Sequence, residues 1–152
     1  MSATLPSAQE QALRLHIYRF WCERGRAPTT GESARALNIP PDAARAIRQR
    51  LHDAHLILLE PDGERIRMAN PLSAVATGFR ARVDGVWLHA NCAWDAPGIP
   101  AMLGCDAEIE AYYSPCDEPV AFRVRAGDLQ APKALVHFAL PFRRWYDDLV
   151  ET

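Results

Sequence analysis

Residues 89–104 of the chain have the sequence HANCAWDAPGIPAMLG. A strand is predicted to end at His89, and the segment after it is predicted to form a short helix. Cys92 would then lie near a strand-to-helix junction, where the unpaired N–H groups of a helix N-terminus favour a thiolate over a thiol. Asp95 follows three residues later and would share its helical face. The stretch therefore predicts a soft nucleophile beside a proton donor.

The same residues also have a purely structural interpretation. A cysteine outside a disulfide is among the most buried residue types. An aspartate near the start of a helix often serves as a cap. The pattern alone favours a buried Cys92 beside a capping Asp95 over a reactive pair.

Composition indicates an ordinary globular chain. Its 152 residues are 49% hydrophobic and 24% charged, which suits one domain or two small domains that share a core. The sequence contains no run of eighteen apolar residues and no signal-peptide pattern, so we expect no membrane partner. The four cysteines include no C-x-x-C pair, which favours a reduced, cytoplasmic location.

Residues 1–70 are predicted to form a winged helix-turn-helix-like domain. Helices are expected from Ser7 to Gly25, over 31–37 and over 41–55, and a hairpin with its turn at Asp62–Gly63 follows. This part contains ten arginines against eight acids, a net charge of +2, whereas the remainder carries −4. Five arginines would lie on the third helix or the wing, where a repressor contacts DNA: Arg45, Arg48, Arg50, Arg65 and Arg67.

Residues 71–152 are predicted to form a β-rich domain. Alternating or continuous apolar residues indicate strands over 77–83, 86–90, 107–113, 120–125 and 134–140, and a final helix over 143–150. The predicted fold class is therefore α+β, with the winged-helix-like three-helix module packed on a small mixed β-sheet.

These motifs, in this order, resemble the alkylmercury lyase family. The resemblance is strongest from Phe79 to Pro141 and lies in WLHANCAWD at 87–95, IPAMLG at 99–104 and the turn at Cys116 with Pro119–Val120. The family combines a winged-helix-like part with a β-rich catalytic part. Its members use two cysteines and an aspartate to split a carbon–mercury bond.

The resemblance implies a function for the residues at 92 and 95. Mercury is soft and prefers thiolate ligands, and thiolate donation makes the carbon bonded to mercury basic enough to accept a proton. Cys92 would be the first thiolate and Asp95 would shuttle the proton. Organomercury, or a related soft organometal, would be a substrate, and no cofactor is implied.

One part of the family pattern has no match. The family's second catalytic cysteine follows the last apolar strand, about where this sequence ends at Thr152. We therefore expect either a shortened form or a chain without that thiol, in which Cys116, Cys105 or a cellular thiol would replace it. Cys92 and Cys116 are the candidate mercury ligands, although the resemblance implies a structural role for Cys116.

Other interpretations remain open at this point. A zinc site could combine His89 and Cys92 with Cys105 or Cys116, but these spacings match no common zinc motif. The chain could instead be a winged-helix DNA-binding metal or redox sensor without enzymatic activity. A third possibility is a domain that keeps the fold but has lost the chemistry.

Overall fold

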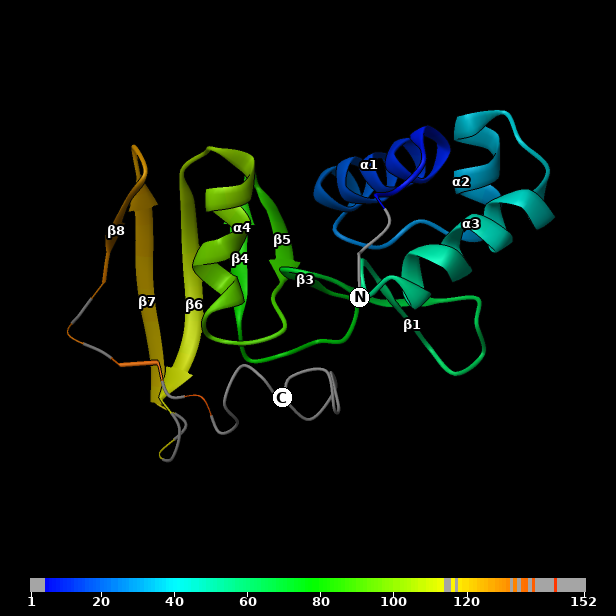
Figure 1. Ribbon diagram of the computed structural model, residues 1–152. Helices are drawn as coiled ribbons and strands as arrows, with labels where there is room; N and C mark the ends of the chain where they lie inside the picture. Colours follow the sequence, from blue (N-terminus) through cyan, green and yellow to red (C-terminus); the bar gives the residue numbers. More distant parts are fainter. Residues whose placement is uncertain are drawn as a thin grey trace.

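The computed structural model describes residues 5–113, 116, 118–131, 133, 135, 136, 138 and 144. An α-helical N-terminal part with a small three-stranded sheet is followed by a five-stranded sheet and a fourth helix (Figure 1). The predicted α+β class is confirmed.

The three N-terminal helices begin and end where local chemistry predicts. Helix α1 (Ala8–Arg24) begins with a capping box between Ser7 and Glu10, and it ends at Gly25, whose φ of 70° leaves the helical region. A second capping box, between Thr29 and Glu32, precedes α2 (Thr30–Leu37). Helix α3 spans Pro41–Asp53 and has proline in its first turn, where the missing N–H has no helical partner to lose.

The predicted wing is part of a three-stranded antiparallel sheet. Strands β1 (Leu58–Leu59) and β2 (Ile66–Ala69) form the expected hairpin, and β3 (Leu72–Ser73) pairs with β2. Strand β3 is not among the strands expected from the sequence. Leu72 also forms a bridge with Ala90, which connects this sheet to the larger one. The domain boundary at 70/71 stays a prediction.

The larger sheet is antiparallel in its described strands, whereas the sequence predicted a mixed sheet. Its strand order is β5-β4-β6-β7-β8, with bounds Arg80–Val83 for β4, Val86–His89 for β5, Ala107–Tyr113 for β6, Glu118–Arg125 for β7 and Asp128–Gln130 for β8. Every pairing between described strands is antiparallel. Two-residue turns at Asp84–Gly85 and Ala126–Gly127, all with positive φ, return the chain directly beside the strand it has just left.

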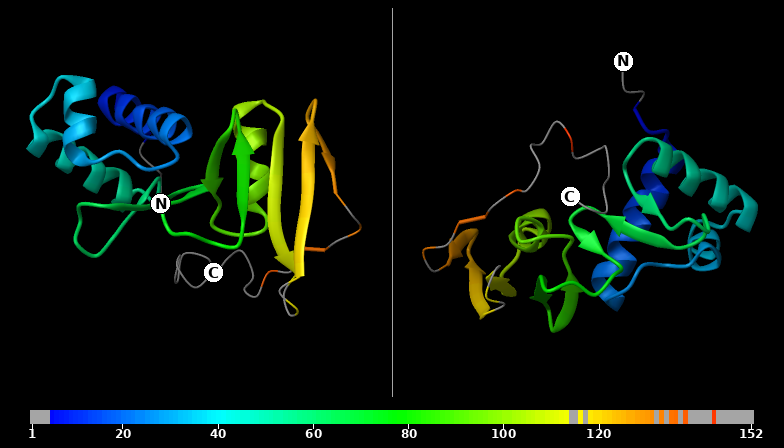
Figure 2. Two further views of the ribbon diagram at one scale, coloured as in Figure 1. Left: turned by 180° about the vertical axis from the view of Figure 1, so that it is seen from behind. Right: turned by 90° about the horizontal axis from the view of Figure 1, so that it is seen from below.

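Helix α4 (Asp95–Leu103) covers one face of this sheet. It packs on β4 and β6, and Figures 1 and 2 show it on one side of the strands. The face towards α4 carries the buried side chains of Ala81, Leu88 and Ile109. These contacts fix the start of α4, and with it the loop that contains Cys92.

The C-terminal predictions fall mostly on residues that the structure does not describe. Of the strand predicted over 134–140, Leu135, Val136 and Phe138 are described, and they are exposed and belong to no strand, so the prediction is wrong at these positions. Phe138 packs against Trp94 instead. The helix predicted over 143–150 lies outside the described residues apart from Arg144. Among the described helices, none is long and apolar enough to cross a membrane.

Trp21 anchors α1 in the core and supplies a test of the fold. Its side chain is only 1% exposed. We expect Trp21→Ala to lower the free energy of unfolding by about 3–5 kcal/mol, because a buried aromatic ring is lost and a cavity remains. Urea denaturation followed by circular dichroism measures this change. Leu15→Ala, on the same helix but at a side chain that is 49% exposed, should cost less than about 1 kcal/mol; equal losses in the two variants would contradict the packing described.

Candidate functional site

The loop between β5 and α4 is held by backbone contacts on both sides. The N–H of Ala90 donates to the carbonyl of Phe79 at 2.9 Å, and the hydroxyl of Thr77 donates to the carbonyl of Ala90 at 2.6 Å. On the helix side, the N–H of Ala96 donates to the carbonyl of Cys92 at 3.2 Å. Cys92 therefore lies at a fixed position immediately before the first turn of α4.

Cys92 and Asp95 contact each other at this junction. The Cys92 Sγ lies 3.4 Å from Asp95 Oδ2, within range of a hydrogen bond from a thiol. Both side chains are partly buried, so each stays reachable from solvent. The structure thus brings together the two residues that the sequence singled out, although Cys92 precedes the helix and does not share a helical face with Asp95.

The protonation state of Cys92 differs from the expectation. Burial raises the pKa of the Cys92 thiol, and this effect outweighs the N–H groups of Asp95 and Trp94 that donate to the sulfur and lower its pKa. The Asp95 carboxylate raises it further. The helix N-terminus is too weak to offset burial, which favours a thiol at Cys92 over the thiolate expected from the sequence.

The pKa of Asp95 is shifted as well. Burial raises the pKa of its carboxyl group, and hydrogen bonds with the side chains of Cys92 and Asn91 offset part of that rise. Asn91 also donates from Nδ2 to Oδ1 of Asn70 at 2.8 Å. Asn91 thus orients the carboxylate, a role that sequence reasoning missed even though Asn91 directly precedes Cys92. A raised pKa makes Asp95 a better proton acceptor than an exposed aspartate.

The raised pKa of Cys92 predicts a specific pH dependence of alkylation. Only the thiolate reacts with iodoacetamide, so the rate at Cys92 should rise about tenfold per pH unit and level off at a higher pH than for N-acetylcysteine. Peptide mass spectrometry measures this rate. Asp95→Asn removes a charge that raises the pKa of Cys92, so the plateau should move to lower pH. A plateau that does not move would contradict the coupling between the two groups.

The loop that carries Cys92 also carries one member of an aromatic pair. Trp94, between Cys92 and Asp95 in the sequence, is 60% exposed. Its ring meets the ring of Phe138 edge-on, with ring centroids 6.1 Å apart. This contact brings Phe138, which follows β8 in the chain, to the Cys92 loop. An exposed aromatic pair therefore lies at the loop that carries the thiol and carboxyl groups.

The other candidate ligands belong to other elements of the chain. Cys116 is exposed in the turn between β6 and β7, whereas Cys22 and Cys105 are partly buried against the core. Nδ1 of His89 accepts the N–H of Thr77 at 3.3 Å. Within the described residues, no three His, Cys, Asp or Glu side chains gather into a metal-binding group, so these residues do not form the zinc site considered from the sequence.

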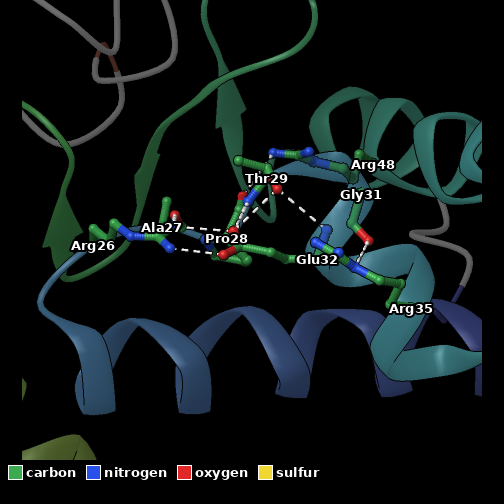
Figure 3. Close-up of polar contacts among 8 residues, drawn as sticks. All are labelled: Arg26, Ala27, Pro28, Thr29, Gly31, Glu32, Arg35 and Arg48. Atoms are coloured by element: carbon green, nitrogen blue, oxygen red, sulfur yellow. Dashed lines mark hydrogen bonds and ion pairs between the residues drawn. The ribbon is translucent and has the colours of Figure 1, made fainter.

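The arginines expected to contact DNA form hydrogen bonds or ion pairs with other residues of the chain. Arg48 is buried; it donates to the hydroxyl of Thr30 and to the carbonyl of Pro28. Figure 3 shows it reaching from α3 towards Pro28, beside the α2 cap. The other four form ion pairs: Arg45 with Asp42 and Glu64, Arg50 with Glu10, Arg65 with Asp62, and Arg67 with Glu60. These contacts give no support to phosphate binding by this face.

Comparison with known proteins agrees with the residue pattern. A sequence model of the alkylmercury lyase family matches residues 72–151. Among solved structures, the mercury-bound form of MerB2 is similar to this chain, with 26% sequence identity and a TM-score of 0.65. The alignment covers 84% of this chain and 60% of MerB2, so the chain spans less than two thirds of that protein. No curated protein sequence matches.

Proposed function

Because the chain belongs to the alkylmercury lyase family, we propose that it binds organomercury through Cys92 and that Asp95 carries the proton that cleaves the carbon–mercury bond. The observation that supports this proposal is the contact of 3.4 Å between the Cys92 sulfur and the Asp95 carboxylate. The similar structure is the mercury-bound form of MerB2, which supports mercury binding by this fold.

In the first step, the Cys92 thiol meets an organomercury cation. Sulfur bonds to mercury and the thiol proton passes to Asp95, which already accepts a hydrogen bond from that thiol. The products of this step are an organomercury–Cys92 thiolate and a neutral Asp95. The raised pKa of Asp95 favours its acceptance of the proton.

In the second step, another thiolate bonds to mercury. The added electron density makes the carbon basic, and Asp95 returns its proton to that carbon. The carbon–mercury bond breaks, a hydrocarbon leaves, and mercury stays bound between two sulfurs while Asp95 is again a carboxylate. We assign the second thiolate to a small cellular thiol, which places the reaction in the reducing cytoplasm.

The aromatic pair at the Cys92 loop suits the organic group of the substrate. The rings of Trp94 and Phe138 offer apolar contact to a phenyl or alkyl group on mercury. A lipophilic substrate would lose contact with water here, while its metal faces sulfur.

A product assay tests this function. The whole chain is incubated with phenylmercury and an excess of a small monothiol, and benzene in the headspace is measured by gas chromatography. We expect benzene release well above that from thiol alone, and we expect Cys116→Ser to retain it. Benzene release no faster than with thiol alone would overturn the proposed cleavage.

A further inference from the structure

Asn70 connects the N-terminal part of the chain to the residue that precedes Cys92. Oδ1 of Asn70 accepts a hydrogen bond from Nδ2 of Asn91 at 2.8 Å. The backbone N–H of Asn91 donates to the carbonyl of Pro71 at 3.4 Å. Both the side chain and the backbone of Asn91 are therefore held by a segment that lies 21 residues earlier in the chain.

Neighbouring elements fix Asn70 in turn. The hydroxyl of Tyr18, on α1, donates to the backbone carbonyl of Asn70 at 2.8 Å, and the Tyr18 ring packs against the hydrophobic core. Strand β3 follows Asn70, pairs with β2 and packs on β5 (Figure 1). Because its backbone is held from both directions, Asn70 presents a fixed acceptor to Asn91.

The contact with Asn70 sets the orientation of the Asn91 amide. Oδ1 of Asn91 is buried and makes no hydrogen bond within the described part of the chain. Its Nδ2 group has two N–H bonds, and Asn70 accepts one of them. The hydrogen bond between the side chains of Asn91 and Asp95 lowers the pKa of that carboxyl group. Without the Asn70 acceptor, the amide would lose the contact that fixes its plane.

We propose that Asn70 is a positioning residue for the Cys92 loop: it holds Asn91, and Asn91 holds the loop in which the Cys92 sulfur meets the Asp95 carboxylate at 3.4 Å. For cleavage this role rests on the proposed function, whereas for the position of the loop it does not. Asn70 precedes residues 72–151, which match the family model. The N-terminal part would thus contribute to the site from outside that match.

Two substitutions of Asn70 in the whole chain separate the acceptor from the bulk of the side chain. Asn70→Leu keeps the size and removes the acceptor, whereas Asn70→Asp keeps an oxygen for Asn91. In single turnovers with phenylmercury and excess monothiol, Asn70→Leu should slow benzene release about 10–100-fold, since small misplacements of reacting groups cost up to that much. Capture at Cys92 should be retained, and Asn70→Asp should restore release.

A double-mutant cycle tests whether Asn70 acts through Asn91. Adding Asn70→Leu to Asn91→Leu should slow release no further, because the contact is already broken. Gln49→Ala is the matched control, since it removes a side-chain amide hydrogen bond of 2.9 Å to Asp53 on α3 and should leave release unchanged. Circular dichroism verifies that each variant is folded. Independent effects of the two substitutions, or equal losses in Asn70→Asp and Asn70→Leu, would overturn the proposal.

Hydrogen exchange tests the position of the loop without any reaction. Peptides that cover residues 90–96 should exchange about 2–10-fold faster in Asn70→Leu, as expected for the loss of one hydrogen bond, whereas peptides from α3 should not change. Unchanged exchange over 90–96 would overturn the positioning role even in a chain that releases benzene. Faster exchange in a chain that releases no benzene would support that role and overturn the proposed cleavage alone.

Discussion

Cys92→Ser is expected to abolish benzene release from phenylmercury, with the rate falling at least about 1000-fold, equivalent to roughly 4 kcal/mol. A serine hydroxyl is a hard ligand and bonds poorly to mercury, so neither the mercury–sulfur bond nor the transfer of the thiol proton to Asp95 can occur. The side chains have similar shape, so the partly buried site should keep its fold. Gas chromatography of the headspace, with excess monothiol present, measures the effect.

Peptide mapping by mass spectrometry separates capture from cleavage in this variant. Phenylmercury should be found on the peptide that contains residue 92 in the unmodified chain and should be missing from it in Cys92→Ser. Cys105→Ser, at the opposite end of α4, is the matched control and should retain benzene release. Undiminished release in Cys92→Ser would show that another group carries the reaction.

The parts of the fold set by neighbouring residues could be predicted from the sequence. The Ser7–Glu10 capping box, the Gly25 stop and the Asp84–Gly85 turn depend on residues within one turn of the chain, and all three are present in the structure. Strands β3 and β8 could not be predicted in this way. Each is only two or three residues long and is defined by pairing with a partner strand, not by its own pattern.

Burial and long-range pairing account for the remaining differences between the sequence-based predictions and the structure. The sequence pattern predicted that Cys92 and Asp95 lie close together. It could not show that burial raises the pKa of the Cys92 thiol more than the helix N-terminus lowers it. Likewise, the arginine pattern on α3 suggested DNA contact because the partners of Arg48 and Arg50 are distant in sequence. Arg50 pairs with Glu10, forty residues away, and the buried Arg48 bonds to the segment before α2.

Asp95→Asn is expected to leave phenylmercury bound at Cys92 but to slow benzene release by about 10²–10⁴-fold, the usual contribution of a positioned general acid or base. Asparagine keeps the shape of the side chain and can still contact the sulfur and Asn91, but its amide cannot take up the thiol proton or return it to carbon. Single-turnover gas chromatography measures release, and mass spectrometry measures capture.

The exposed Asp128 on β8 supplies the control for this variant. Asp128→Asn removes the same charge far along the chain from the Cys92 loop, and it should change neither capture nor release. If Asp95→Asn lowers capture and release by the same factor, the carboxylate acts in binding alone. If it lowers only release, then the proton delivered to carbon passes through Asp95, as expected from a carboxylate that burial has made a stronger base and that already accepts the hydrogen bond of the thiol.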